Sequence, residues 1–430
     1  MHLVRVGCRN ALCGEQNAVS GFLENLRNGK NMAFLVLKDA SGRLQVTIDK
    51  ILRPELAGLI EKITIGSVVS VQGLLVENPS VKLGGCELLP DQITIESLAE
   101  PLPMAKNANI DTRMDYRWLD LRSDQNLLLF KAQTYMLECL RSFLLEREFI
   151  EIHTPKLIAA ASESGAEVFE LSYFDRKAYL SQSPQFYKQM AMAAGFEKVF
   201  EVGPVFRAEK SFTHKHATEF TGFDLELSYI QSFHDVMRLQ EEMLASMLKK
   251  LAERYGEEIR RVWGIEIAVP ALPFPVMKLQ DLYHALKERF GYELPKEEQT
   301  DLTAEAEKLS FEYTKEVFGH EFLFVTDFPK DKRAFYHMRK DGVPQGYDLI
   351  WRGVEITTGA QREHRHELLR AQAEEKGLNE DVKFYLDFFR YGCPPHGGFG
   401  MGVDRLTMLL FGLGIKEASF LFRGPNRLTP

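Results

Sequence analysis

GGFGMGVDRL, at Gly397–Leu406, is the stretch that decides the fold of this chain. Its four glycines lie in a strand-like segment, where they let another molecule approach the backbone closely. The apolar residues that follow, through Phe411, predict a helix. Arg405 then falls in the first turn of that helix, where a cation opposes the helix dipole. Because this placement is unfavourable unless an anion lies opposite, the stretch favours a nucleotide-binding site.

A second polar stretch, Val199–Leu227, is predicted to form a strand, a polar loop and a return strand. Alternation places Asp224 and Glu226 on one face, and Arg207 and Glu209 together on another. Charged side chains at strand centres are costly to bury unless they are paired or bind a ligand. A salt-bridge ladder on a solvated face remains the alternative to a ligand site for this stretch alone.

The composition of the 430-residue chain is ordinary for a globular protein, with a hydrophobic fraction of 45%. The formal net charge of -8 argues against a surface that coats nucleic acid as a whole, although a local basic patch stays compatible with it. We see no apolar core of a signal peptide and no run of about 18–20 apolar residues. These features predict a cytoplasmic protein without a membrane partner.

The cysteines of the chain are five in number and scattered, and they include no CxxC pair. This pattern predicts neither a zinc ribbon nor a disulfide framework, and it is typical of a reducing cytosol.

The N-terminal part, residues 1–100, is predicted to be β structure with one helix at Pro54–Ile63. Short runs rich in Val, Leu, Ile and Phe are bounded by turn signals. This order favours a small Greek-key barrel of the OB type, with an SH3-like barrel as the alternative. The predicted strands are Ala18–Leu23, Ala33–Lys38, Arg43–Ile48 and Val68–Val76.

A linker is predicted at residues 101–125, followed by a second domain at 126–430. The second domain opens with a long helix from Leu127 and a strand at Phe149–His153, and it carries a strongly amphipathic helix at residues 231–262. Strands and helices mix without a regular βαβ rhythm. The pattern predicts an α+β fold with a mostly antiparallel sheet.

Three segments in this order resemble the signature motifs of the class II aminoacyl-tRNA synthetases. Motif 1 corresponds to residues about 127–155, motif 2 to about 199–227 and motif 3 to about 397–411. The resemblance covers nearly the whole chain, including the OB barrel expected of subclass IIb. It implies an antiparallel sheet flanked by helices, and a homodimer formed through motif 1.

Four further segments resemble the aspartyl-tRNA synthetases of the archaeal type, within a subclass that handles aspartate, asparagine or lysine. The resemblance implies that Lys188 and Arg362 pair with the side-chain carboxylate of L-aspartate and reject a neutral amide. The alternatives are a surface lysine for Lys188, and a pairing with Glu355 or Glu363 for Arg362. The four segments are Tyr179–Gln189, Gly353–His366, Tyr391–Gly398 and Arg427–Pro430.

The reaction implied by the resemblance is attack of the aspartate α-carboxylate on the α-phosphorus of ATP. Aspartyl-adenylate and pyrophosphate form, and the 3′ end of the tRNA then takes the aspartyl group. Arg207 would contact the α-phosphate, and Arg405 would hold the γ-phosphate and stack on the adenine. The other expected ATP contacts are Glu209, His216, Phe220, Glu355 and Gly402.

Mg²⁺ is the implied cofactor, because it prefers hard oxygen ligands and accompanies ATP. Glu355 and Thr358 match the metal positions of the family, with a salt bridge from Glu355 to Arg352 or Arg362 as the alternative. The α-ammonium of aspartate would meet Ser183, Gln185 and Asp224. Glu163 lies on a loop at 162–167 that would close over the substrate, or that is a plain surface loop.

The implied partner is tRNA(Asp), with tRNA(Asn) as a further substrate in some aspartyl enzymes. Anticodon bases would stack on Phe34, where a core position is the alternative, and would be read by Arg27, Gln45 and Lys82. Two residues depart from the family pattern, namely Glu24 on the barrel and Lys215 before His216. The competing functions are an asparaginyl-tRNA synthetase, a paralogue that makes asparagine, and a non-catalytic RNA-binding paralogue.

Overall fold

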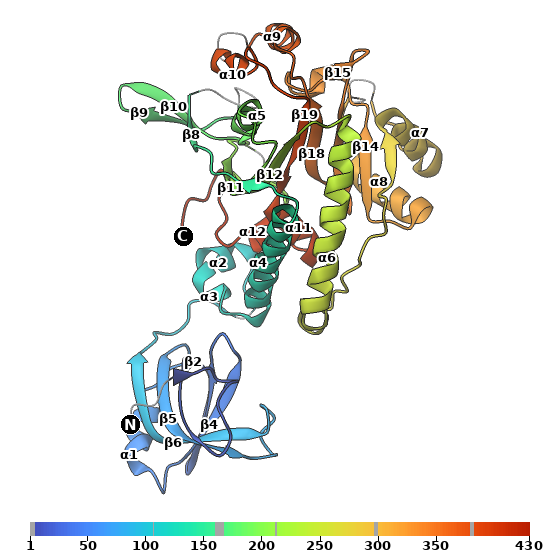
Figure 1. The fold of residues 1–430 in the computed structure, drawn as a ribbon. Helices are drawn as coiled ribbons and strands as arrows, with labels where there is room; N and C mark the ends of the chain where they lie inside the picture. Colours follow the sequence, from blue (N-terminus) through green and yellow to red (C-terminus); the bar gives the residue numbers. More distant parts are fainter. Residues whose placement is uncertain (1–4, 106, 160–166, 211–212, 296–299, 379–381) are drawn as a thin grey trace. The chain divides into compact units, whose positions relative to one another are not determined.

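The computed structural model describes residues 5–105, 107–159, 167–210, 213–295, 300–378 and 382–430 (Figure 1). The chain divides into two compact units, Met1–Asp120 and Leu121–Pro430. Within the described ranges, we find no helix that has both the length and the apolar character needed to cross a membrane.

The N-terminal unit is a closed β-barrel. Its sheet runs in the order β1-β2-β3-β4-β6-β5, and pairing of β5 with β2 closes it. One helix, α1, lies between β4 and β5, as in an OB fold, so the OB prediction is confirmed and the SH3-like alternative is not. The elements are β1 (Arg5–Val6), β2 (Gln16–Asn28), β3 (Met32–Lys38), β4 (Arg43–Asp49), α1 (Pro54–Ile60), β5 (Val68–Glu77) and β6 (Cys86–Ser97).

Strict alternation builds the core of this barrel. Ala33, Leu35 and Leu37 of β3 are fully buried, whereas Phe34 and Val36 between them are only partly buried. A pleated strand sends successive side chains to opposite faces, so one apolar set fills the barrel and the other faces outward. Phe34 therefore lies on the outer face of the barrel, and the alternative interpretation of Phe34 as a core residue is wrong.

Two short helices, α2 (Ile110–Asp115) and α3 (Arg117–Asp120), occupy the segment that the sequence predicts as a linker. Asn109 caps α2, because its side-chain oxygen accepts from the backbone N–H of Thr112 at 2.9 Å. The Arg117 side chain is buried and pairs with Asp120. These local bonds explain why regular structure forms where proline and asparagine suggest none.

The second unit is built on an eight-stranded sheet in the order β13-β14-β17-β18-β19-β12-β11-β7. All neighbouring strands are antiparallel except the pairs β13–β14 and β11–β7, so the expected mostly antiparallel sheet is confirmed. The sheet strands are β7 (Ile150–Glu151), β11 (Lys198–Phe206), β12 (Glu219–Ser228), β13 (Val276–Lys278), β14 (Phe322–Thr326), β17 (Gly346–Trp351), β18 (Val354–Arg362) and β19 (His396–Gly402).

Smaller strands and the helices complete this unit. A three-stranded sheet has the order β8-β10-β9, and β15 pairs with β16. The small strands are β8 (Leu157–Ile158), β9 (Glu170–Tyr173), β10 (Arg176–Leu180), β15 (Arg339–Lys340) and β16 (Val343–Pro344). The helices are α4 (Asp124–Leu145), α5 (Gln185–Ala193), α6 (Phe233–Trp263), α7 (Leu279–Phe290), α8 (Ala304–Phe318), α9 (His366–Glu375), α10 (Lys383–Asp387), α11 (Val403–Phe411), α12 (Ile415–Ala418) and the 3-10 turn η2 (Lys330–Lys332).

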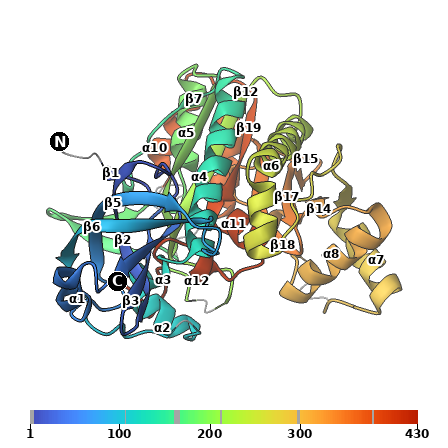
Figure 2. The same cartoon turned by 90° about the horizontal axis from the view of Figure 1, so that it is seen from below.

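The two faces of the central sheet carry different chemistry. Helices α4, α6 and α11 share one apolar core with the sheet (Figures 1 and 2), to which β12 contributes Phe223 and Leu225 and β19 contributes Phe399 and Met401. Because side chains alternate, Asp224 and the other polar residues of β12 point to the opposite face. The functional residues therefore gather on the face that α4, α6 and α11 leave free.

Glycines of β19 leave the space that the carboxylates of β12 occupy. In the β12–β19 register, Asp224 pairs with Gly400 and Glu226 with Gly398. A methyl group on Gly400 would lie 2.8 Å from the Asp224 carboxylate. A methyl group on Gly398 would overlap the carboxylate of Glu226 and the carbonyl of Leu225.

We therefore expect Gly398→Ala to lower the free energy of unfolding by about 3 kcal/mol, because overpacking at this contact forces the backbone to shift. Gly402→Ala is the matched control on the same strand, since its added methyl group would meet its nearest neighbour at an ordinary 3.7 Å. Urea denaturation of both variants measures the difference. Equal stability of the two would contradict the role given to Gly398.

Candidate active site

A cavity of about 310 Å³ opens on the polar face of the central sheet. It brings together nearly all of the residues that the sequence assigns to the site, from β12, β18, β19 and the segments beside them. Lys188 is not among the lining residues, and Glu163 lies outside the described residues. The predicted residues that line the cavity are Ser183, Gln185, Arg207, Glu209, His216, Phe220, Asp224, Glu355, Thr358, Arg362, Gly402 and Arg405.

Arg207 lies directly after β11, at one end of the cavity. Its guanidinium carbon is 5.6 Å from the centre of the Phe220 ring, and its Nη1 is 3.7 Å from Oε1 of Glu209. The Nε atom of Arg207 is buried and has no hydrogen-bond partner within the described residues. A buried donor without a partner is costly, so this atom is suited to an anionic ligand.

Arg405 stands in the first turn of α11, as the sequence predicts, and its guanidinium faces β18. Its Nη1 donates to the backbone carbonyl of Glu355 at 2.9 Å, and its Nε donates to that of Lys215 at 3.4 Å. Neither contact neutralises the charge with a carboxylate. The positive end of the helix and the guanidinium together make this part of the cavity attractive to phosphate.

Glu355 is the carboxylate at the centre of these cations. Burial alone would raise its pKa, but Arg405 and then Arg333, Arg207 and Lys215 outweigh burial and lower the pKa. Its expected alternative pairings with Arg352 and Arg362 are wrong, because Arg352 pairs with Glu321 and Arg362 pairs with Glu226. Glu355 is therefore ionised and surrounded by positive charge.

Two ion pairs beside the cavity were missed by sequence reasoning. Arg333 makes two bonds to Asp348, at 2.9 and 2.7 Å, and Asp348 also accepts from the Thr358 hydroxyl at 2.9 Å. Burial, only partly offset by Arg333, raises the pKa of Asp348 to about 6. Lys215, which departs from the family pattern, pairs with Glu307 of α8 at 2.5 Å. A charged residue in the apolar strand GYDLIW is the one signal that could have revealed Asp348.

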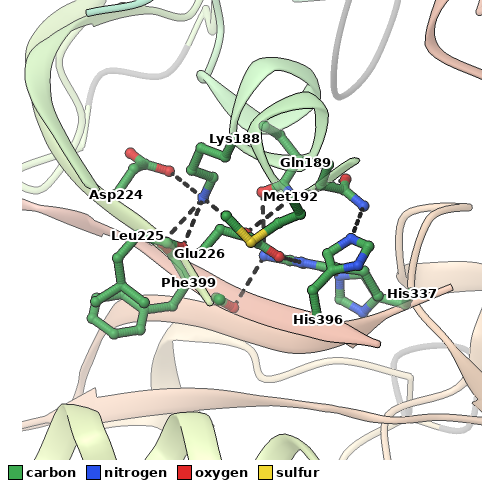
Figure 3. A network of polar contacts seen from close by, with 12 residues as sticks. Lys188, Gln189, Met192, Asp224, Leu225, Glu226, His337, His396 and Phe399 are labelled. Atoms are coloured by element: carbon green, nitrogen blue, oxygen red, sulfur yellow. Dashed lines mark hydrogen bonds and ion pairs between the residues drawn. The ribbon is translucent and has the colours of Figure 1, made fainter. Parts of the chain in front are cut away.

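Lys188 on α5 is fully buried, and its ammonium group points toward Asp224 and the backbone of β12 and β19 (Figure 3). Its Nζ is 2.9 Å from Oδ1 of Asp224 and 3.5 Å from Oε2 of Glu226. It also donates to the carbonyls of Leu225 at 3.4 Å and Phe399 at 3.2 Å. The surface-lysine alternative is therefore wrong.

Arg362 ends β18 and lies in the same buried network. Its Nε donates to Oε1 of Glu226 at 3.0 Å, and its Nη2 donates to Oε1 of Gln185 at 3.2 Å and to the Gly398 carbonyl at 3.0 Å. Glu363 pairs with Arg365 instead, so both alternative partners of Arg362 are excluded. Although burial opposes ionisation, Arg362 and Lys188 lower the pKa of Glu226.

Two buried histidines complete the network, and their neighbours fix their protonation. Nδ1 of His396 donates to the Pro394 carbonyl at 2.8 Å, so Nε2 accepts from Gln189 at 2.9 Å. Burial lowers the pKa of His396 to about 4. Nε2 of His337 faces the Arg362 guanidinium at 3.3 Å and must accept from it, while burial and Arg362 lower the pKa of His337. Both rings are neutral at pH 7.

The candidate RNA-binding residues lie on the outer face of the barrel unit. Arg27 of β2 pairs with Phe34 of β3, and its guanidinium carbon is 6.0 Å from the ring centre. Gln45 of β4 donates to Thr47 at 3.1 Å. Lys82 is exposed in the turn between β5 and β6.

Glu24, the unexpected acid on this surface, is neutralised locally. Oε1 of Glu24 accepts from Nη2 of Arg43 at 2.7 Å. The carboxylate therefore adds little net negative charge to the face that would meet RNA.

These features together are typical of a nucleotide-using enzyme with a nucleic-acid-binding module. They are a glycine-rich strand, two arginines suited to bind phosphate, and an OB barrel. Two family patterns match the chain: tRNA synthetases class II (D, K and N) over residues 109–422, and OB-fold nucleic acid binding domain over residues 13–96. The chain belongs to the class II tRNA synthetases of the D, K and N family.

Relatives resemble the chain over almost its whole length. An aspartate--tRNA(Asp/Asn) ligase of Aeropyrum pernix is 39% identical, covering 99% of this chain and 98% of its own. An aspartate--tRNA(Asp) ligase of Pyrococcus abyssi is 39% identical, covering 97% of both chains.

Solved structures agree in fold. The asparaginyl-tRNA synthetase of Pyrococcus horikoshii, complexed with asparaginyl-adenylate, has a TM-score of 0.92 at 29% identity, with 100% of both chains covered. The aspartyl-tRNA synthetase of Entamoeba histolytica has a TM-score of 0.87 at 30% identity, with 100% of this chain and 93% of its own covered.

The neutral state of His396 predicts a specific loss of stability in acid. The unfolded histidine takes up a proton near pH 6.5, whereas the folded one resists protonation until about pH 4. Stability therefore falls as the pH falls through this window, and at pH 5 this group alone has removed about 2 kcal/mol relative to pH 7.

We expect His396→Gln to show a smaller difference between its unfolding free energies at pH 7 and pH 5 than the unchanged protein, by about that amount. Urea denaturation at both pH values measures it. His284→Gln is the control, because the His284 side chain is 72% exposed. The same pH dependence in His396→Gln and the unchanged protein would refute the assignment.

Proposed function

We propose that this protein activates L-aspartate with ATP to aspartyl-adenylate and pyrophosphate, and then transfers the aspartyl group to the 3′ end of tRNA(Asp). One observation carries the choice of amino acid: the buried network of Lys188, Arg362, Asp224 and Glu226 beside the cavity. The names of the relatives in the D, K and N family support the same choice.

Charge balance in that network favours aspartate over asparagine. Without substrate, two cations face two carboxylates, and the charges cancel. Asp224 lines the cavity and is the carboxylate that a substrate α-ammonium would contact. Once it does so, Lys188 and Arg362 face Glu226 alone, and one positive charge is left for the side-chain carboxylate of aspartate. A neutral amide would leave that charge uncompensated in a buried site.

The ATP end of the site would act mainly by position and charge. Arg207 would contact the α-phosphate and the attacking carboxylate, while Arg405 would hold the γ-phosphate and stack on the adenine. Phe220 would cover the base, with Glu209 beside it. His216 would reach the terminal phosphates; burial and Arg405 lower its pKa, so it acts as a neutral donor.

Mg²⁺ would be held by Glu355 and Thr358, with Asp348 beside them. The Thr358 hydroxyl is 3.2 Å from Oε1 of Glu355 and 2.9 Å from Oδ1 of Asp348, so three hard oxygens converge. Within the described residues, no cluster of three or more His, Cys, Asp or Glu side chains could hold a metal by itself. A few oxygens fit an ion that keeps several waters and shares phosphate ligands, and its charge would offset that of ATP.

The barrel would bind the anticodon through Phe34 as a stacking platform, with Arg27, Gln45 and Lys82 around it. The chain would act as a cytoplasmic homodimer through motif 1. The dimer is supported by exposed apolar side chains at the β7 edge of the central sheet, where Leu145 and Ile150 are 54% and 46% exposed.

The amino acid is tested by ATP–pyrophosphate exchange with each candidate substrate. We expect exchange with L-aspartate and at least about 10⁴-fold less with L-asparagine, because a mismatched buried polar site discriminates by that order. Exchange with asparagine alone would identify an asparaginyl enzyme. No exchange with any amino acid would favour a non-catalytic RNA-binding protein.

The tRNA is tested by charging separate tRNA(Asp) and tRNA(Asn) transcripts with aspartate. We expect tRNA(Asp) to be charged, and the result with tRNA(Asn) decides whether both are substrates. Exchange with aspartate but no charging of either transcript would contradict the transfer step and favour a paralogue that makes asparagine.

Arg207→Ala should lower the exchange rate by about 100-fold or more, because a charge contact with the transition state is lost. Arg261→Ala is the control, since the Arg261 side chain is 65% exposed on α6 and does not line the cavity. The urea midpoint shows that both variants remain folded. A near-normal exchange rate in a folded Arg207→Ala would refute the assigned contact.

A further inference from the structure

Two cysteines that are far apart in the sequence meet in the N-terminal unit. The Sγ atom of Cys13, in the segment before β2, lies 3.4 Å from the Sγ atom of Cys86, the first residue of β6. Cys13 is exposed and Cys86 is half-buried, so small reagents in solvent can reach the pair. The other thiols differ, because Cys8 and Cys139 are buried and Cys393 is half-buried elsewhere.

Backbone hydrogen bonds hold both cysteines against the same end of β5. The N–H of Gly14 donates to the carbonyl of Leu75 at 2.7 Å, and the N–H of Leu75 donates to the carbonyl of Glu15 at 3.1 Å. Cys86 is the register partner of Glu77 in the β5–β6 ladder. The contact between the sulfurs is therefore a consequence of the barrel topology and not of a free tail.

We propose that Cys13 and Cys86 form a modification site at which hydrogen peroxide oxidises the two thiols to one reversible intramolecular disulfide. The Cys13 sulfur attacks the peroxide, the O–O bond breaks, and a sulfenic acid and one water are formed. The Cys86 sulfur then displaces the hydroxyl group as a second water. Two electrons leave the thiols and reduce the peroxide, and a dithiol reverses the change.

The order of the two steps follows from exposure. Cys13 is the more exposed thiol and meets the oxidant first. The hydrogen bond with Cys13 raises the pKa of Cys86, which keeps Cys86 protonated and slow to react by itself. A disulfide needs the sulfurs about 2 Å apart, so they must move closer than in the reduced protein. Disulfides in reducing compartments are usually transient and regulatory, in agreement with a reversible site.

The link would act on the surface that we propose reads the anticodon. Glu87 directly follows Cys86, and its carboxylate accepts from the side chains of Gln45 at 3.4 Å and Asn78 at 2.8 Å. A bond at Cys86 displaces the start of β6, and with it the group that holds Gln45. This consequence rests on the proposed function, whereas formation of the disulfide does not.

The chemistry is tested on the reduced, full-length protein with hydrogen peroxide. The protein is then denatured, the remaining thiols are blocked with N-ethylmaleimide, and the peptides are analysed by mass spectrometry. We expect one crosslinked peptide pair, Cys13 with Cys86, that dithiothreitol removes, while Cys8, Cys139 and Cys393 are alkylated. Cys13→Ser and Cys86→Ser should each lose the pair, and the matched control Cys393→Ser should keep it.

Oxidation of Cys13 to a sulfinic acid with Cys86 still alkylated would overturn the proposal. A crosslink between two chains would do the same.

The effect of the disulfide on tRNA charging is tested by comparing the reduced and the oxidised protein. We expect the KM for tRNA(Asp) in aminoacylation to rise several-fold on oxidation and to recover with dithiothreitol, with ATP–pyrophosphate exchange unchanged, because the pair lies in the N-terminal unit. Peroxide should leave the KM of Cys86→Ser unaffected. Unchanged aminoacylation by fully crosslinked protein would refute the effect on tRNA. Failure of exchange in the reduced protein would instead refute the proposed function.

Discussion

The structure of the catalytic unit depends on one packing constraint between two neighbouring strands. β12 carries carboxylates on its polar face, and β19 can pair with it only because Gly398 and Gly400 have no side chains there. The space left by these glycines fixes Asp224 and Glu226. The carboxylates in turn hold two cations in a region that excludes water. A buried cation without them would be too costly to keep.

The charged side chains in and beside the cavity alternate in sign, starting from these two carboxylates of β12. The amino-acid end uses a buried network, in which the neutral rings of His396 and His337 accept hydrogen bonds from Gln189 and Arg362 and add no charge. The phosphate end is different, because the buried Nε atom of Arg207 has no hydrogen-bond partner within the described residues and the Arg405 guanidinium donates to backbone carbonyls. One cavity therefore joins an end whose charged groups are paired in a buried network and an end where arginine donors can still bind a ligand. Such a division suits two substrates that differ in charge.

Local patterns were enough to predict the features that depend on neighbours in sequence. Arg405 at a helix start, the glycine strand, the alternating acids of β12 and the OB order of the first unit all follow from short-range periodicity and turn chemistry. The depth of Lys188, the pairs Arg333–Asp348 and Lys215–Glu307, and the thiol contact in the barrel do not. Their partners come from separate segments, and only the folded topology decides which charges or sulfurs meet. Capping by Asn109 likewise outweighed the linker-like composition around it.

Asp224 pairs with Lys188 and also lines the cavity. This arrangement has a consequence for the binding of other small metabolites. In the proposed reaction a ligand must bring an ammonium group to release Lys188 from Asp224, and a carboxylate to replace it. A small dicarboxylic acid such as succinate offers the second group without the first, and it would add negative charge to a network that is already balanced. The pocket would thus bind abundant organic acids only weakly, although they have nearly the same size and shape as its substrate.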